Sequence, residues 1–327
     1  MRLYFTFGAA FLFLDDRFAA SIRGLTMKQT YLKSAVSPLK SMRELYALYV
    51  FSSRNLERRA NDIASSTRTS VAMLEEFSQR KIQGTKVLEI GPGQTKPFLY
   101  ALGRTNEYIA IDLEIPPARS SLAEFVRIFK ENGVLRFVKS LGRHVLGIDA
   151  ALERALSKEF GGTPRGRFVQ GDASAPVFEL ESFDHVVSTS VFEHLPDPAA
   201  VMRQVSRILK PGGTVLTVTH LYTSLTGAHD PRVFVDFEAL PPWAHLNPRE
   251  KHKVNSNSYL NKLRIADYRE IFAANWPGCS HKLTGGHAVL KRRLLDQLPA
   301  SVKSAYTEEE LLSDVLISLW KKPELTA

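Results

Sequence analysis

The feature that most constrains this chain is a short apolar run that ends in a pair of glycines. Residues 86–90, Lys-Val-Leu-Glu-Ile, have the composition of a buried strand, and Gly91, Pro92 and Gly93 follow them directly. Glycine permits backbone conformations that are closed to residues with a Cβ, and it lets a ligand approach the chain closely. Because open α/β sheets bind ligands at the carboxyl ends of their strands, the stretch predicts a binding turn. A plain strand, turn and helix is the alternative interpretation.

Two details narrow the ligand of this turn. A dinucleotide site needs a third glycine where this chain has Lys96, and Glu89 places a carboxylate near the turn, which favours a cationic ligand over a phosphate. A second apolar run, residues 108–111, ends in Asp112, nineteen residues beyond Gly93. A carboxylate at that position can accept hydrogen bonds from both hydroxyls of a ribose. The pattern therefore predicts a nucleoside that carries a positive group.

At this point the sequence resembles the class I S-adenosylmethionine-dependent methyltransferases of the small-molecule type. Residues 167–173 resemble the third strand of that family and its adenine-contacting acidic residue, 183–198 the fourth strand and the loop beyond it, and 208–216 the turn into the fifth strand. The resemblance covers residues 80–220 well and the remainder more loosely. It implies an α/β fold: a Rossmann-like, doubly wound, seven-stranded, mostly parallel sheet with an antiparallel last strand, plus a helical N-terminal region and a helical insertion.

The resemblance also implies a cofactor, S-adenosyl-L-methionine, and a set of residues that bind it. The implied contacts are Glu89, Gly91 and Gly93 around the methionine end, with Pro92 between them; Asp112 and Leu113 at the ribose; Asp172 and Ala173 at the adenine; and Ser188, Thr189 and Ser190 closing the pocket. An ordinary strand-end carboxylate is the alternative for each of the two aspartates.

The candidates on the acceptor side are three histidines. His194 follows the fourth strand, His220 follows the fifth, and His229 lies in the long loop after it. Methyl transfer from a sulfonium depends mainly on alignment, and a base is needed only for a hydroxyl or a protonated amine. Histidine suits that role near neutral pH. His220 and His229 rank ahead of His194, because the Glu-His pair of the family can serve structure or cofactor contacts. A structural hydrogen-bonding role is the alternative for each histidine.

The amino-acid composition indicates the cellular compartment and excludes some kinds of site. Of 327 residues, 44% are hydrophobic and 24% are charged, as in ordinary soluble globular proteins. The single cysteine, Cys279, excludes an internal disulfide, and no Cys/His cluster has the spacing of a zinc site. We therefore expect a cytoplasmic protein and no metal site.

The net charge of +9 is unevenly spread along the chain. Lys and Arg outnumber Asp and Glu by 12 to 7 in residues 1–80 and by 9 to 5 in residues 116–165, whereas residues 81–115 and 166–327 are balanced. Basic surfaces attract nucleic acid, anionic lipid or acidic substrates. No RNA-binding signature accompanies the basic residues, so peripheral contact with an anionic membrane or a solvated basic face is favoured over a nucleic-acid partner.

Three segments are expected. Residues 1–26 carry an apolar run of twelve residues, which is too short to span a bilayer as a helix. The run could be the core of a signal peptide. Alternatively, translation starts at Met27 and residues 1–26 are an over-extended start, which is the interpretation that we favour. The expected division is a 1–26 extension, a 27–80 helical cover, and an 81–327 methyltransferase domain with a helical insertion at 116–165 and a long acceptor-side loop at 220–254.

The insertion carries two apolar stripes at helical spacing, with basic residues between them. The stripes are Leu122, Phe125, Val126 and Phe129, then Val134, Phe137, Val138 and Leu141, and the basic residues include Arg127, Lys130, Arg136 and Lys139. The pattern fits a core-packed helical pair, a substrate lid or a membrane-surface element. Elsewhere, the expected strands are 86–90, 107–112, 167–170, 184–189, 213–219, 279–284 and 314–321, the expected helices include 198–209 and 258–272, and 210–213 is expected to be a turn.

The function that these patterns favour is methyl transfer from S-adenosylmethionine to a small-molecule acceptor, at a hydroxyl of a sugar, a lipid-like molecule or a secondary metabolite. The alternatives are methylation of a nucleic acid or a protein, and a non-catalytic cofactor-binding module. The sequence predicts no oligomeric state.

Overall fold

A computed structural model provides the structure of the protein. It describes residues 56–93, 95–113, 148–175, 178–230, 232–233, 237–256 and 258–324. The expected 1–26 extension, the first part of the helical cover and residues 114–147 of the insertion lie outside the described residues. Both apolar stripes and the four basic residues of the insertion are therefore untested predictions.

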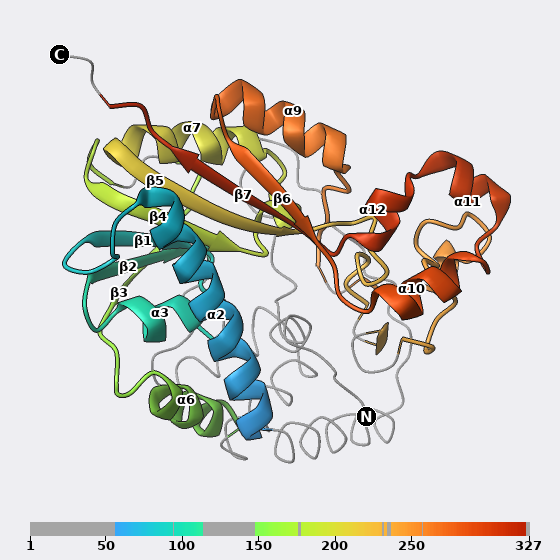
Figure 1. Ribbon diagram of the computed structural model, residues 1–327, viewed down its shortest axis with the longest axis horizontal. Coiled ribbons are helices and arrows are strands. Elements are labelled where there is room, and N and C mark those ends of the chain that lie inside the picture. Colours follow the sequence, from blue (N-terminus) through green and yellow to red (C-terminus); the bar gives the residue numbers. More distant parts are fainter. Residues whose placement is uncertain are drawn as a thin grey trace, which may run out of the picture.

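The described strands form one mixed sheet of seven in the order β3-β2-β1-β4-β5-β7-β6 (Figure 1). The strands are β1 Lys86–Ile90, β2 Glu107–Asp112, β3 Arg167–Gln170, β4 Phe183–Thr189, β5 Leu209–His220, β6 Ser280–Thr284 and β7 Val315–Lys321. Strands β1 to β5 pair in parallel, and β7 is antiparallel to both of its neighbours. The predicted fold class, including the antiparallel last strand, is confirmed.

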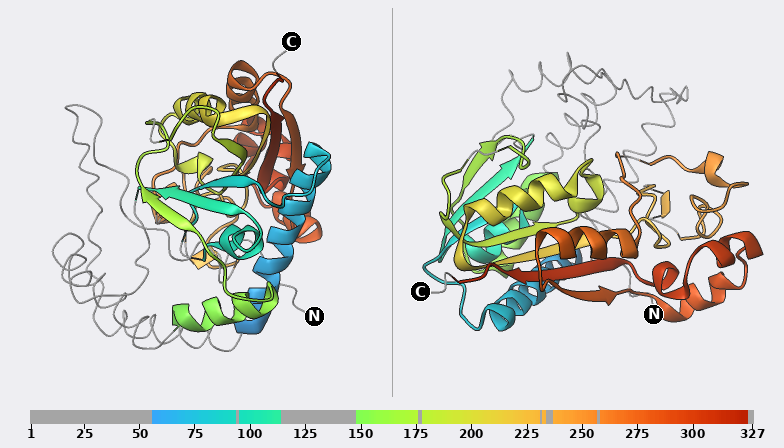
Figure 2. Two further views of the ribbon diagram at one scale, coloured as in Figure 1. Left: turned by 90° about the vertical axis from the view of Figure 1, so that its left-hand side faces the viewer. Right: turned by 90° about the horizontal axis from the view of Figure 1, so that it is seen from above.

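Helices cover both faces of the sheet (Figures 1 and 2). The α-helices are α2 Leu56–Ser78, α3 Pro97–Leu102, α6 Ile148–Glu159, α7 Pro198–Ile208, α9 Ile265–Asn275, α10 Ala288–Leu295, α11 Ala300–Ala305 and α12 Glu308–Leu312, and two 3₁₀ turns are η1 Phe192–His194 and η2 Lys251–Lys253. Helices α7 and α9 pack on one face, and α2 and α3 pack on the other. Within the part of the chain that the structure describes, no helix has both the length and the apolar character to cross a membrane.

The inner strands β2, β1, β4, β5 and β7 bury residues on both of their faces, as is usual for sheets covered by helices on both sides, whereas the edge strands β3 and β6 are half-buried or exposed. Successive side chains of a strand point to opposite faces. Val87 therefore joins the cluster under α2 and α3, whereas Leu88 and Ile90 join the cluster under α7 and α9. In the latter cluster Trp276, at the end of α9, stacks on Trp320 of β7 with ring centroids 5.5 Å apart.

Two expectations about local structure are corrected. Residues 258–264 do not belong to the helix expected at 258–272, because α9 begins only at Ile265. Lys262 is instead in the left-handed region at φ 60°, and Asn261 bonds to the loop after β4 rather than within a helix. The turn expected at 210–213 lies inside β5, which starts at Leu209 with an irregular register against β4.

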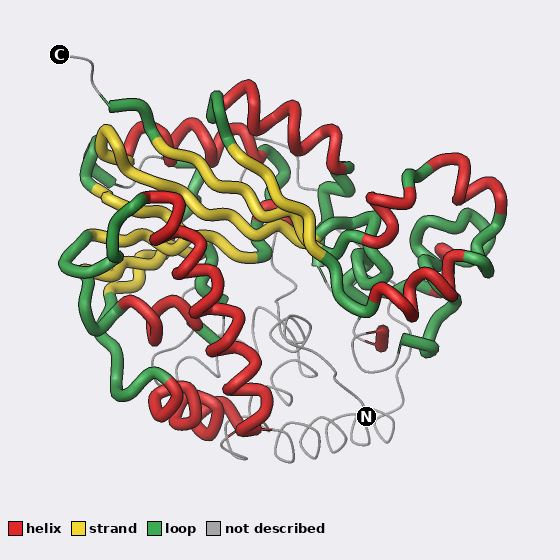
Figure 3. The backbone as a smooth tube through the Cα atoms, viewed as in Figure 1, coloured by secondary structure: helices red, strands yellow, loops and turns green. Residues whose placement is uncertain are grey.

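A smaller lobe lies beyond one end of the sheet (Figure 3). It consists of α10 to α12 and the described parts of the loop at 220–254, and it has an apolar cluster of its own around Trp243. His220, the last residue of β5, pairs with Val315, the first of β7. The lobe therefore lies at the carboxyl edge of the parallel strands, the edge where such sheets bind ligands.

Candidate functional site

The two glycines after β1 meet different surroundings. Gly91 and Gly93 have φ values of +69° and +59°, in the left-handed region that favours glycine. A Cβ added to Gly91 would lie 2.3 Å from Cγ2 of Val191, in the loop after β4. A Cβ added to Gly93 meets no described atom within 4 Å. Gly91 thus allows the turn to pack against the next loop, while Gly93 leaves an open side for a ligand.

The predicted ribose and adenine contacts lie side by side at the ends of β2 and β3. Asp112 is half-buried at the last position of β2, and its carbonyl accepts a hydrogen bond of 2.9 Å from the N–H of Gly171. Asp172 follows immediately and is exposed, with Oδ1 accepting from the N–H of Ser174 at 2.8 Å. Ala173 is partly buried against the core below α7.

Leu113 is held in the same region, since its carbonyl accepts from Nε2 of Gln170 at 3.0 Å. On the other side of β1, Ser188 Oγ donates to the carbonyl of Ile90 at 3.1 Å, and the N–H of Ser190 donates to the carbonyl of Val218 at 2.7 Å. Thr189 lies between them at the end of β4. Every predicted cofactor contact described here therefore lies on β1, β2 or β4 or directly after β1 to β4.

Glu89 differs from its expectation. Its side chain is 1% exposed, and the Tyr108 hydroxyl donates a hydrogen bond to it. Burial raises the pKa of Glu89 to about 8; the Tyr108 hydrogen bond opposes this shift and the nearby Asp112 adds to it. The group is therefore largely protonated at neutral pH, and not the negative charge that we expected beside a cationic ligand. Its contact with the cofactor stays a prediction.

These placements fit an adenosyl cofactor. The open side of Gly93 would admit it next to the backbone, and Asp112 offers a half-buried carboxylate one strand away. The assignment of individual contacts rests on the resemblance and stays a prediction.

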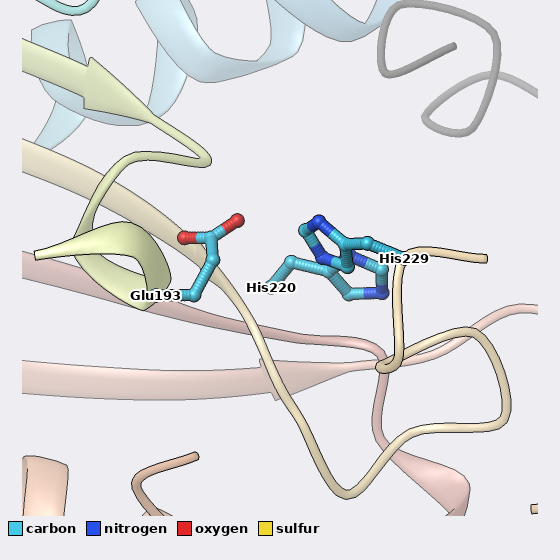
Figure 4. A group of neighbouring side chains, drawn as sticks. All are labelled: Glu193, His220 and His229. Carbon is cyan, nitrogen blue, oxygen red and sulfur yellow. The ribbon is translucent and has the colours of Figure 1, made fainter. Parts of the chain in front are cut away.

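The three candidate histidines, remote in sequence, come together at this edge. His194 is in η1, His220 ends β5, and His229 belongs to the following loop. The ring centroid of His229 lies 5.0 Å from that of His194 and 4.7 Å from that of His220. Figure 4 shows the His220 and His229 rings lying almost face to face, with Glu193 beside them. All three histidines are buried.

Burial keeps these imidazoles neutral. Desolvation lowers the pKa of His220 to about 4, with Asp314 opposing the shift, and it lowers the pKa of His229 well below its ordinary value. The pKa of His194 is also lowered by desolvation, and the hydrogen bond to the Tyr259 carbonyl opposes this shift. A neutral imidazole is the form that can accept a proton or bind a metal ion.

His194 has a defined tautomer. Its Nδ1 lies 2.7 Å from the carbonyl oxygen of Tyr259, and a carbonyl can only accept, so Nδ1 carries the proton. Its Nε2 is buried and has no hydrogen-bond partner among the described residues. His194 therefore has a buried lone pair on a ring that lies next to His229, which gives it a stronger geometric case as a base than our sequence-based ranking allowed.

Glu193 is a buried member of the site that the sequence analysis did not select. It is 1% exposed, and neither carboxylate oxygen makes a hydrogen bond of normal geometry to a described group. Desolvation raises its pKa to about 8, although the backbone N–H groups of Glu193 and His220 lie near enough to oppose the shift. The adjacent Glu-His pair was the available signal, but adjacency did not reveal that both side chains face the same cluster.

The segment 258–264 holds the loop that carries Glu193 and His194. Asn261 Nδ2 donates to the carbonyls of Phe192 at 2.7 Å and Leu195 at 3.1 Å, and its backbone N–H donates to the carbonyl of Glu193 at 2.9 Å. Phe192 anchors the loop in the hydrophobic core, where its side chain is 1% exposed. The helical pattern of this segment concealed its role from sequence reasoning.

Comparison with known proteins gives the family. The family described as "Methyltransferase domain" matches residues 132–217. The chain is 33% identical over 217 residues to the ubiquinone biosynthesis O-methyltransferase of Xanthomonas campestris pv. campestris (strain B100), an alignment that covers 58% of this chain and 87% of that protein. The chain belongs to the class I S-adenosylmethionine-dependent methyltransferase family. The cofactor of the family is S-adenosylmethionine.

Other relatives are covered less completely. The chain is 27% identical over 139 residues to a probable chloroplastic tocopherol O-methyltransferase of Oryza sativa subsp. japonica, covering 40% of this chain and 38% of that protein. It thus spans little more than a third of that relative. A solved structure, phosphoethanolamine N-methyltransferase 2 of Haemonchus contortus in complex with S-adenosyl-L-methionine, aligns over 79% of this chain and 53% of its own, with a TM-score of 0.45 and 16% identity.

Proposed function

We propose that this methyltransferase-family protein transfers the methyl group of S-adenosylmethionine to a hydroxyl oxygen of a small, lipid-like molecule, with His194 as the base. The observation that carries the proposal is the buried Nε2 of His194, which has no hydrogen-bond partner among the described residues and belongs to a ring 5.0 Å from that of His229. The glycine turn lies close by, since Gly91 packs against Val191, three residues before His194. Both O-methyltransferase relatives, by name, modify oxygen in tocopherol and in ubiquinone biosynthesis.

The cofactor, when bound, supplies a methyl group on a positively charged sulfur. The glycine turn and Asp112 would hold that cofactor, and His194 Nε2 would accept the proton that the acceptor hydroxyl gives up when its oxygen takes the methyl group. The Tyr259 carbonyl holds the proton on Nδ1 and stabilises the imidazolium that results. The remaining acceleration comes from alignment of the two reactants.

The low basicity of the cluster favours an acidic hydroxyl. Desolvation lowers the pKa of His194, so it is a weaker base than an ordinary histidine. A weaker base has less driving force for taking a proton from the acceptor. A phenol, with a pKa of about 10 as in tyrosine, suits such a base better than the much less acidic hydroxyl of a sugar. We therefore favour a phenolic or enolic acceptor among the hydroxyl compounds.

The test is an acceptor screen with purified protein and isotopically labelled cofactor. The panel contains prenylated phenols and quinols, sterols, sugars, ethanolamine phosphates, duplex DNA, RNA and a histone-type protein, and mass spectrometry locates the methyl group. We expect methylation of a phenolic oxygen. Methylation on carbon or nitrogen, or of a macromolecule alone, would refute the proposed acceptor class.

The role of His194 is tested with His194→Gln. Loss of a general base lowers turnover by about 10²- to 10⁴-fold, and we expect the affinity for S-adenosylhomocysteine to stay unchanged. His252→Gln, at an exposed position in η2, is the matched control and should retain full activity. Unchanged turnover in His194→Gln would exclude this residue as the base.

A further inference from the structure

We propose that Glu193, His220 and His229 form a binding site for a divalent first-row transition-metal ion. The proposal concerns metal binding itself, and it stands whether or not the methyl acceptor is a phenol. We expected no metal site from the sequence, because the chain has no cysteine and histidine spacing of the zinc type.

The geometry brings three ligand atoms together from separate segments. One nitrogen of each imidazole and one carboxylate oxygen lie within 4.8 Å of one another, and all three side chains are buried. Figure 4 shows the carboxyl group of Glu193 reaching toward the paired rings. Bonds of 2.0–2.1 Å around a tetrahedral ion place ligand atoms about 3.3 Å apart. Side-chain rotations that shorten these separations from at most 4.8 Å by up to about 1.5 Å would therefore close the group around an ion.

The donor set decides the kind of metal. Two imidazoles and one carboxylate are ligands for Zn²⁺ and for open-sited Fe²⁺ or Mn²⁺ centres. Magnesium prefers oxygen ligands and retains several waters, so it fits two buried histidines poorly.

Glu193 supplies the independent observation. A carboxyl group that is 1% exposed is costly to bury, and neither of its oxygens makes a hydrogen bond of normal geometry to a described group, although the backbone N–H groups of Glu193 and His220 lie nearby. A divalent cation would neutralise the ionised carboxylate and satisfy one of its oxygens. No described lysine or arginine makes an ion pair with Glu193.

Neighbouring groups hold the ligands in place. The hydroxyl oxygens of Thr226 and Ser224 lie 3.0 and 3.2 Å from His220 Nε2, contacts of the kind that orient metal-binding imidazoles. The Asn261 N–H fixes the carbonyl of Glu193. With three protein ligands the ion keeps an open position, as catalytic zinc sites do. An acceptor hydroxyl bound there would lose its proton more readily, next to His194.

The direct test measures metal binding by the full chain, purified without a polyhistidine tag, treated with chelator and dialysed. Calorimetric titrations use ZnCl₂, CoCl₂, MnCl₂ and MgCl₂, and the cobalt complex is also followed by visible absorption. We expect one site for Zn²⁺ and Co²⁺, with a cobalt band typical of four or five ligands, and no comparable binding of Mg²⁺. The absence of saturable Zn²⁺ and Co²⁺ binding by the unaltered protein would overturn the proposal, without the need for any variant.

Two variants and one control locate the site. Glu193→Gln and His229→Gln should each weaken Zn²⁺ binding on the order of 100-fold or more, whereas His252→Gln should bind as the unaltered chain does. Circular dichroism and binding of S-adenosylhomocysteine verify that each variant is folded. Equal Zn²⁺ affinity in folded Glu193→Gln and in the control would also overturn the proposal. Metal binding without methylation of a phenol would leave this site standing and refute only the proposed acceptor.

Discussion

Replacing Gly91 by alanine should destabilise the protein by about 2–5 kcal/mol, because the new methyl group meets two separate obstacles. The backbone is at φ +69°, where a Cβ costs roughly 1–2 kcal/mol. The same Cβ would lie 2.3 Å from Val191 Cγ2, well inside van der Waals contact. Overpacking of this kind adds about 1–3 kcal/mol, since the surrounding loop must shift.

Gly93→Ala is the matched control. Its φ of +59° carries the same backbone cost, but its Cβ would meet no described atom within 4 Å. We expect it to lose only about 1–2 kcal/mol of stability. It should nevertheless bind S-adenosylhomocysteine poorly, because the methyl group would project into the space that we assign to the cofactor.

The double variant Gly91→Ala with Val191→Ala separates the two obstacles. Removing both Val191 γ-methyls relieves the 2.3 Å contact and leaves the Val191 Cβ at 3.5 Å, an ordinary van der Waals distance. The pair should therefore be less destabilised than the sum of the single variants, which a double-mutant cycle measures. Urea unfolding followed by tryptophan fluorescence gives the free energies, and calorimetry gives cofactor affinity. If Gly91→Ala is no less stable than Gly93→Ala, or if the cycle shows no coupling, the packing argument is wrong.

Three further predictions concern Asp112, Glu89 and Asn261. Asp112→Ala should lose about 1.5–3 kcal/mol of cofactor binding for each ribose hydrogen bond, and unchanged affinity by calorimetry would contradict the assignment. Burial raises the pKa of Glu89 from 4.5 to about 8. Between these two values the folded protein keeps a proton that the unfolded chain has released, so the free energy of unfolding falls as the pH rises from about 4.5 through 8. Glu89→Gln should therefore lose less stability than the unaltered chain between about pH 6 and 8 in urea unfolding, and an identical slope would refute this. Asn261→Ala removes the hydrogen bonds to the carbonyls of Phe192 and Leu195. We expect a loss of about 1–3 kcal/mol in stability and slower turnover with unchanged cofactor affinity. A variant that matches the unaltered chain in both stability and turnover would show that this segment does not position the loop.

The sheet was predictable because its signals are local. The first three strands are short runs closed by glycine or an acidic residue, and the observed β1, β2 and β3 coincide with the predicted ranges 86–90, 107–112 and 167–170. The glycine turn was predictable for the same reason, since the ability to adopt a positive φ is a property of glycine itself. The prediction of a helix at 258–272 was wrong for residues 258–264, because Asn261 bonds to carbonyls 66 and 69 positions away in the sequence.

The sequence by itself placed His194 and His220 at the ligand-binding edge of the sheet, because each follows the carboxyl end of a strand, and it placed His229 in the long loop after β5. Only the tertiary structure decided that they meet, with Glu193, in one buried cluster. The pairing of β4 with β5 and the return of the following loop bring the four side chains together. Burial then changes their chemistry, raising the pKa of Glu193 and lowering those of the histidines. Desolvation depends on everything packed around a group, so no local pattern of residues can reveal it.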